Sequence, residues 1–364
     1  MTAFADLRAS AAFAALVAVS ARLGRDPAQV QAAGGNSSLK SGGAMWVKAS
    51  GFWLAEAEAR DIFLPVDVAG LRAALEAGDD PDAMAFVPAE ANPAGLRPSI
   101  ETTLHATLDW PVVLHSHCVA TIATAVRADA EAVLAERLAG LDPVFVPYAM
   151  PGPSLARAIL DRAGARARVV VLGNHGLVVG GEDVATAETL LREVSARLGA
   201  GPETARAGGD AADPSPDADP SPDADLVAQL EGSGWAPARH ASTHALARDP
   251  VLCAVVDGGS LYPDHVIFLG PGVAVARAGE TPDAAVARLG GMSKLLLLPG
   301  QGAALRSDAT AAQHAMARCL GDVAAQVAPG AVLTRLSPAD EAALLNWDAE
   351  KYRQALEAAR EAGQ

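Results

Sequence analysis

Two histidines lie two residues apart at the end of an apolar run in the stretch VVLHSHCVA. His115 and His117 close the segment 112–117, which has the composition of a buried β-strand. Side chains two residues apart on a strand point to the same face, so we expect the two imidazoles to lie side by side. A catalytic zinc site takes about three protein ligands and keeps one position open. The pair could supply two of them, although each histidine could equally be a hydrogen-bonded residue near a strand end.

A third candidate ligand ends another apolar run, VVVLGNHG at 169–176. His175 lies between Gly173 and Gly176, which permit a tight backbone turn. Cys118 follows the first pair directly, but it should point to the opposite strand face and is expected to be a small core residue. The three histidines together therefore predict a site for zinc or another divalent metal.

A carboxylate and a possible helix cap occur together in RPSIETTLH, residues 97–105. Pro98 and Ser99 are helix start signals, and Ser99 could cap the helix while the first amides face an anion. Glu101 falls in the first turn and could point out of the helix end toward the same pocket. The macrodipole alone also favours an acid there, so an ordinary surface role stays open. We expect His105 to be structural.

Small residues fill two loops that flank a predicted strand, GGNSS at 34–38 and ASG at 49–51. Their N–H groups could form an anion-binding nest, although such loops are more often plain turns. Neither loop has the GK[ST] ending of a phosphate-binding Walker loop or the GxGxxG of a dinucleotide turn. We expect the nearby Lys40 and Lys48 to be solvated.

The composition narrows the class of protein. A formal net charge of −15 disfavours nucleic acid as a partner. The 3 cysteines form no CxxC, which fits a reducing cytoplasm. The Ala-rich start of the chain has no basic region before it, and no apolar run reaches transmembrane length. We therefore expect a soluble cytoplasmic protein with no membrane partner.

The segment GPETARAGGDAADPSPDADPSPDAD, residues 201–225, separates two parts of the chain. It has almost no large apolar side chain, so it cannot bury enough surface to offset its ordering entropy. We predict a metal-binding α/β domain at 1–200, an acidic linker at 201–225 and a smaller C-terminal α/β domain at 226–364. The apolar periodicity predicts helices at 4–23, 100–108, 154–164, 185–199, 310–327 and 338–360, and strands at 44–50, 112–117, 169–176, 251–259, 266–270, 272–277 and 294–300.

Five motifs occur in one order along the first part, namely GGNSS, ASG, PSIE, HSH and NHG. In this order they resemble the class II aldolase/adducin family, which includes zinc-dependent sugar-phosphate aldolases such as L-fuculose-phosphate and L-rhamnulose-phosphate aldolase. The resemblance covers roughly residues 10–200, and LYPDHVIFLGPG in the C-terminal part resembles the extension of longer members. It implies a three-layer α/β/α domain around a mainly antiparallel sheet, and a homo-oligomer, usually a tetramer.

The resemblance also implies a role for each motif. It implies that His115, His117 and His175 bind zinc and that Glu101 is the catalytic acid/base. It also implies a phosphate-binding site formed by Asn36, Ser50, Gly51 and Ser99. The activity implied is that of a lyase acting on a sugar phosphate or a related hydroxy-carbonyl compound. Such an enzyme cleaves or forms a carbon–carbon bond through a metal-stabilised enediolate.

The chain departs from the family pattern at three points. Asn174 replaces the first histidine of the usual HHG motif, and Ile100 replaces a second serine after Ser99, which removes one hydroxyl donor. The short aldolases place a tyrosine acid soon after HxH, supplied by a neighbouring subunit. Tyr148 is the sole tyrosine of the predicted first domain, and it follows HxH at a distance, so the proton donor is unassigned.

Two other functions follow from relatives in the same family. Pentulose-phosphate 4-epimerases and thiosugar-phosphate dehydratases use the same metal for other bond changes. Adducin-like scaffolds lack the metal histidines, whereas all three are present here. An aldolase is thus the leading hypothesis, an epimerase or dehydratase is the alternative, and a scaffold is disfavoured.

Overall fold

The computed structural model describes residues 2–200 and 224–346. Contacts divide the chain into two compact units, whose described parts are residues 2–125 and 129–198 in the first, and 126–128, 199–200 and 224–346 in the second. Residues 201–223 of the predicted linker and 347–360 of the last predicted helix lie outside the described residues, and helix α9 begins at Ala224. Within the described ranges, no helix combines the length and apolar character needed to cross a membrane.

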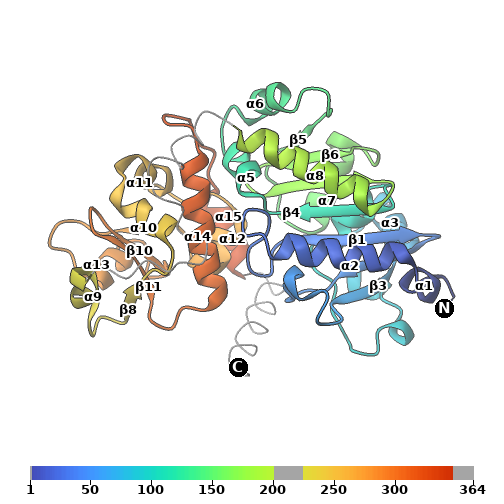
Figure 1. Ribbon diagram of the computed structural model, residues 1–364, viewed down its shortest axis with the longest axis horizontal. Coiled ribbons are helices and arrows are strands. Elements are labelled where there is room, and N and C mark those ends of the chain that lie inside the picture. The colour runs from blue at the N-terminus through green and yellow to red at the C-terminus, as the bar shows by residue number, and fades with distance from the viewer. Residues whose placement is uncertain (1, 201–223, 347–364) are drawn as a thin grey trace. The chain divides into compact units, whose positions relative to one another are not determined.

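A seven-stranded sheet forms the centre of the first unit (Figure 1), in the order β3-β2-β1-β4-β7-β6-β5. Every neighbouring pair is antiparallel except β5 and β6, so the sheet is mainly antiparallel, as predicted. The strands are β1 Asn36–Ser41, β2 Ala44–Lys48, β3 Phe63–Asp67, β4 Val112–Ser116, β5 Val144–Val146, β6 Val169–Leu172 and β7 Gly176–Gly181.

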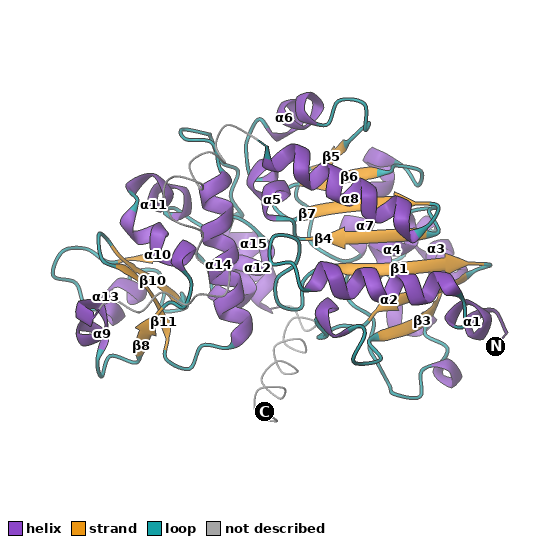
Figure 2. Cartoon of the chain, viewed as in Figure 1, coloured by secondary structure: helices purple, strands orange, loops and turns teal. Residues whose placement is uncertain are grey.

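Helices cover both faces of this sheet, which gives the predicted three layers (Figure 2). On one face, α2 and α8 bury an apolar cluster that includes Leu16, Leu114 and Val194. On the other face, α3, α4 and α7 pack against residues such as Val47 and Val113. The helices of this unit are α1 Thr2–Arg8, α2 Ala11–Gly24, α3 Val68–Glu76, α4 Thr102–Thr107, α5 Val119–Ala125, α6 Ala130–Arg137, α7 Pro153–Ala163 and α8 Val184–Gly199, with 3₁₀ turns η1 Leu54–Glu56, η2 Ala83–Phe86 and η3 Ala89–Ala91.

The predicted helix at 4–23 is two helices in the structure. Ser10 caps α2, because its hydroxyl accepts a hydrogen bond from the backbone N–H of Phe13 at 3.1 Å. A serine whose hydroxyl accepts a hydrogen bond from a first-turn N–H is favoured at the start of a helix and disfavoured in its interior. The apolar period therefore identified the helical stretch but not the break within it.

The second unit is a smaller α/β structure around a four-stranded sheet in the order β8-β11-β10-β9. Its strands are β8 Trp235–Pro237, β9 Ala274–Val275, β10 Leu295–Leu298 and β11 Gly302–Arg306. Its helices are α9 Ala224–Leu230, α10 Ala241–Arg248, α11 Pro250–Val256, α12 Pro263–Leu269, α13 Pro282–Ala287, α14 Ala311–Gln326 and α15 Pro338–Asn346.

Two of the strands predicted in this unit are wrong, because 251–256 and 266–269 are helical. Each apolar run is too short for its period to separate a strand from a buried helix. The residues at the start of each segment distinguish a helix from a strand instead. Pro250 and Pro263 lie in the first turns of α11 and α12, and the Asp249 carboxylate accepts a hydrogen bond from the N–H of Val251 at 2.7 Å.

His265 of the YPDH segment lies inside α12 and serves the fold. Its Nδ1 accepts from the N–H of Leu261, and its Nε2 donates to the carbonyl of Gly272, both at 3.4 Å. Burial lowers the pKa of His265 to about 4, so the ring is neutral at physiological pH.

Candidate metal centre

The end of β4 presents His115 and His117 to the face of the sheet that carries α4. His115 lies between β1 and β7, opposite Asn36 on one side and Val178 on the other. His117 follows immediately after Ser116, the last residue of the strand. Both side chains are buried, and their Nε2 atoms are 3.1 Å apart. The two imidazoles are therefore neighbours, as the period of a strand predicts.

The turn between β6 and β7 brings His175 to the same place. The N–H of His175 donates to the carbonyl of Leu172 at 3.1 Å, and Asn174 has a φ of +55°. Asparagine tolerates this left-handed conformation better than most residues, which gives a structural reason for Asn174 where the family usually has histidine. The turn directs the His175 ring toward the pair on β4.

Gly176 allows β7 to approach β4 closely at this turn. A Cβ added at Gly176 would lie 2.4 Å from the carbonyl oxygen of Ser116. We expect Gly176→Ala to lower the free energy of unfolding by about 2–3 kcal/mol, because backbone must move to relieve the clash. Urea unfolding measures the change. Gly78→Ala is the control, since nothing lies within 4 Å of its added methyl and only its φ of +84° costs energy, about 1 kcal/mol. Equal losses for the two variants would contradict the assigned clash.

Glu101 caps α4 rather than lying inside it, so the helix begins later than predicted, at Thr102. The N–H of Glu101 donates to the Ser99 hydroxyl at 3.2 Å, and the N–H of Thr102 donates to the Ser99 carbonyl at 3.0 Å. This turn aims the Glu101 side chain away from the helix and into the group of histidines.

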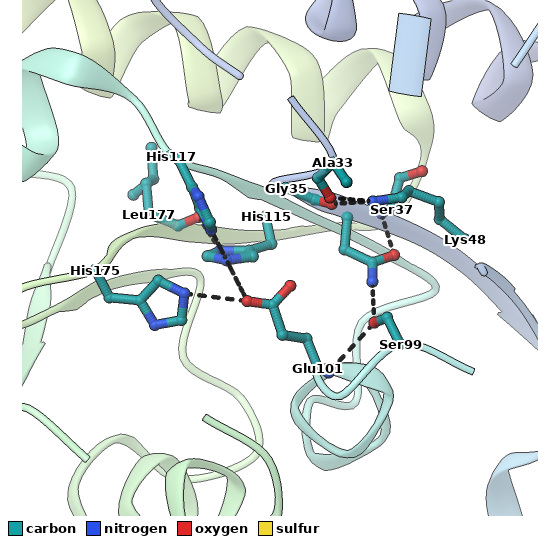
Figure 3. A network of polar contacts seen from close by, with 11 residues as sticks. Ala33, Gly35, Ser37, Lys48, Ser99, Glu101, His115, His117, His175 and Leu177 are labelled. Atoms are coloured by element: carbon teal, nitrogen blue, oxygen red, sulfur yellow. Dashed lines mark hydrogen bonds and ion pairs between the residues drawn. The ribbon is translucent and has the colours of Figure 1, made fainter. Parts of the chain in front are cut away.

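The four side chains converge on one point (Figure 3). Glu101 Oε1 lies 3.0 Å from the Nε2 atoms of both His115 and His175, and 3.9 Å from that of His117. One ligand atom from each of the four residues lies within 4.8 Å of all the others, and all four residues are buried. Nitrogens about 2.0–2.1 Å from one tetrahedral zinc would be about 3.3 Å apart, so the separations suit a metal.

Hydrogen bonding to the backbone supports a cation at this point. His115 Nδ1 lies 2.9 Å from the carbonyl oxygen of Leu177, which can only accept, so Nδ1 carries the proton. In a neutral ring Nε2 then presents a lone pair to Glu101 Oε1 at 3.0 Å, which is repulsive unless a proton or a metal ion lies between them. A backbone carbonyl on the remote ring nitrogen is also the usual partner of a metal-ligating histidine.

The pKa shifts favour an ionised Glu101 carboxylate and a neutral His175 imidazole. Burial by itself would raise the pKa of Glu101, but the charge of His115 and the hydrogen bonds of the three histidines outweigh it and hold the pKa well below its usual range. Burial lowers the pKa of His175 to about 4, against the hydrogen bond of Glu101. Ionised carboxylate and neutral imidazole are the forms that bind divalent metals.

The residues predicted to cradle phosphate lie in neighbouring segments. The Asn36 side-chain amide donates to the Ser99 hydroxyl, and the backbone N–H of Ser50 donates to the carbonyl of Arg97 at 2.9 Å. Gly51 follows in the turn after β2, with a φ of +79°. The Ser99 oxygen accepts from both Asn36 and Glu101, so its own proton is left to donate. The structure thus gathers these segments beside Glu101, and their role in binding an anion stays a prediction.

The expectation that Lys40 and Lys48 are solvated is wrong. Lys48 Nζ donates to the carbonyls of Ala33 and Gly35, and Lys40 Nζ donates to those of His105 and Leu108. Strand alternation carried a usable signal for Lys48, because it falls on the same face as the buried Trp46 two residues earlier.

The remaining candidates take structural places. Cys118 is buried in the apolar cluster under α2 and α8, and its thiol lies 3.3 Å from the Ser195 hydroxyl. His105 Nδ1 lies 2.8 Å from the Ser38 hydroxyl, and burial holds the pKa of His105 well below its usual range. The Tyr148 hydroxyl lies 3.9 Å from the Met150 sulfur.

Comparison with known proteins matches most of the first unit to one protein family. Residues 14–197 match the family described as Class II Aldolase and Adducin N-terminal domain. A Bacillus subtilis (strain 168) protein called uncharacterized oxidoreductase YuxG is 33% identical over 181 residues, which are 46% of this chain and 26% of that protein. The chain therefore spans about a quarter of that relative's length.

Two solved structures illustrate the similarity to known chains. The N-terminal class II aldolase domain of a conserved Thermoplasma acidophilum protein is 27% identical with a TM-score of 0.45, covering 52% of this chain and 92% of that one. L-fuculose-1-phosphate aldolase from Thermus thermophilus is 18% identical with a TM-score of 0.35, covering 52% and 97%. Since the family match spans half of the sequence, the chain belongs to the class II aldolase and adducin N-terminal domain family.

Proposed function

We propose that the chain is a metal-dependent lyase of the aldolase type, with His115, His117 and His175 as metal ligands and Glu101 as the acid/base. The observation that carries the proposal is the convergence of these four buried side chains on one point. Family membership supports it, because aldolases of this class are metal-dependent. Zinc is the metal we propose, since neutral imidazoles in a tetrahedral set suit it well.

The residues of the chain divide the chemistry between them. When bound, a divalent metal supplies Lewis-acid polarisation of a substrate carbonyl. The Glu101 carboxylate, ionised in its buried position, accepts a proton at the carbon beside that carbonyl and returns it in the reverse direction. Asn36 and Ser99 donate hydrogen bonds to an anionic oxygen group of the substrate and thereby fix its orientation. The proposed substrate is a sugar phosphate or a related hydroxy-carbonyl compound.

Metal analysis and a cleavage screen test this proposal. We expect about one equivalent of zinc per chain in purified protein or after zinc reconstitution, because four donors converge on a single point. With phosphorylated and free ketoses, the loaded protein should release an aldehyde that a coupled dehydrogenase detects. Protein that binds no divalent ion after reconstitution would refute the proposal. An isomeric product without aldehyde would place the chain with the epimerases instead.

Assembly into a homo-oligomer is part of the same proposal, because family aldolases place their sites near subunit boundaries. Light scattering during size-exclusion chromatography measures the assembly directly. If the protein is a monomer, a neighbouring subunit cannot supply the proton-donating tyrosine that the short aldolases use.

A further inference from the structure

Alternate side chains of β1 are bonded to the segment that leads into α4 and forms it. Asn36, Ser38 and Lys40 lie on one face of the strand, because side chains two residues apart point the same way. The Asn36 amide donates to the Ser99 hydroxyl. The Ser38 hydroxyl lies 2.8 Å from Nδ1 of His105, and Lys40 Nζ donates to the carbonyl of His105 at 2.7 Å. Both the start and the middle of the segment are therefore held against β1.

The backbone of Glu101 depends on these contacts at both of its polar groups. Its N–H donates to the Ser99 hydroxyl, and its carbonyl accepts from the N–H of His105, each at 3.2 Å. The helix α4 has only 6 residues, and a helix this short takes its position from tertiary contacts rather than from its own stability. The bonds of Ser99 and His105 to β1 therefore fix the place of Glu101.

The same strand also positions a metal ligand. In the pairing of β1 with β4, Asn36 lies opposite His115 and Ser38 lies opposite Val113. One strand is thus bonded to both partners of the contact between Glu101 Oε1 and His115 Nε2, which are 3.0 Å apart. A change in the distance between β1 and α4 would alter that contact directly.

The contact between Ser38 and His105 uses one ring nitrogen and leaves the other unpaired. Both residues are 0% exposed, so a substrate does not touch either of them. In the part of the chain that the structure describes, Nε2 of His105 is buried without a hydrogen-bond partner. An unpaired buried nitrogen is unfavourable, so an apolar side chain would suit this position better if packing were its only role. The hydrogen bond of Nδ1 is what favours histidine here.

We infer that His105 is a positioning residue for Glu101 and that it acts through its contact with Ser38. The contact sets the distance of α4 from β1, and thereby the place of the Glu101 carboxylate beside His115. Such a role matters for turnover, because a displacement of about 1 Å at a reacting group can cost about 10²-fold in rate. The inference rests on the proposed function for the role of Glu101 in the reaction.

Three variants of the full-length protein and one control test this inference. His105→Asn keeps an amide at the position of Nδ1, whereas His105→Gln moves the amide to the position of the unpaired Nε2. Ser38→Ala removes the other partner of the contact. Ser37→Ala is the matched control, because the Ser37 hydroxyl also joins β1 to a helix, through Ser20 of α2 at 2.6 Å, but on the opposite face of the sheet. Zinc affinity from chelator competition, kcat and KM for any ketose cleaved, and urea unfolding are measured for each protein.

The expected result separates the two ring nitrogens of His105. His105→Gln and Ser38→Ala should each weaken zinc binding by about tenfold and lower kcat by about tenfold or more, with KM within about threefold, because the carboxylate beside the ligands is displaced. His105→Asn and Ser37→Ala should keep zinc affinity and kcat within about threefold of wild type, since the Nδ1 contact or its equivalent stays. Combining His105→Gln with Ser38→Ala should add no further loss, because both changes remove one contact.

Two results would overturn the inference. One is wild-type zinc affinity and kcat in Ser38→Ala, whatever the loss in stability, and this variant is sufficient if His105→Gln does not fold. The other is an equal loss in His105→Asn and His105→Gln, which would make His105 a packing residue. Weaker zinc binding confined to Ser38→Ala and His105→Gln, in a protein that cleaves no ketose, would sustain the positioning of Glu101 while the proposed lyase activity fails.

Discussion

Replacing His115 with alanine is expected to abolish stable metal binding and, with it, lyase turnover. His115 is the most enclosed of the three histidines, held by the Leu177 carbonyl through Nδ1 and by β-strand neighbours on both sides. Its removal takes away one nitrogen of the set and exposes the Glu101 carboxylate to an empty buried space. Loss of an outer-shell partner alone typically costs about 10–100-fold in metal affinity, so loss of the ligand should exceed about 100-fold.

Zinc content after dialysis and competition with a chromophoric chelator measure this effect. His265→Asn is a suitable control, because His265 is equally buried and both its nitrogens are used in hydrogen bonds to the backbone. The control should lose stability but keep its zinc. His115→Ala protein that retains one tightly bound zinc would exclude His115 as a ligand.

Glu101→Gln is expected to lower kcat by about 10²–10⁴-fold while the protein stays folded and keeps most of its zinc. Glutamine has nearly the shape of glutamate but cannot accept the proton. The shape matters here, because the side chain lies against His115 and His175 at 3.0 Å and a smaller residue would leave a cavity. The neutral amide also removes the negative charge of the carboxylate, which the buried site keeps ionised.

Single-turnover cleavage with saturating substrate separates this effect from binding. Glu90→Gln, a change at an exposed carboxylate in η3, should leave kcat unchanged. Full turnover in Glu101→Gln, or an equal loss in the two variants, would refute the acid/base role.

The pairing of the strand histidines and most of the long helices could be predicted before the fold was known. Period-two alternation puts His115 and His117 on one face wherever the strand lies, because the side chains of a strand alternate by geometry. The helices α2, α7, α8 and α14 also follow from their 3.6-residue apolar period. The short apolar runs of the second unit could not be assigned in this way, since four to six residues fit either period equally well.

The sequence by itself determined the local chemistry of this protein, namely two imidazoles on one strand face, a third at a turn and a carboxylate at a helix start. The order of these motifs also indicated the protein family. How these groups meet depends on the tertiary structure. The carbonyl of Leu177 selects the His115 tautomer, and the carbonyls of Ala33 and Gly35 bind the Lys48 ammonium. Both contacts involve backbone carbonyls, which every residue carries alike, so only the path of the folded chain reveals which of them binds a side chain.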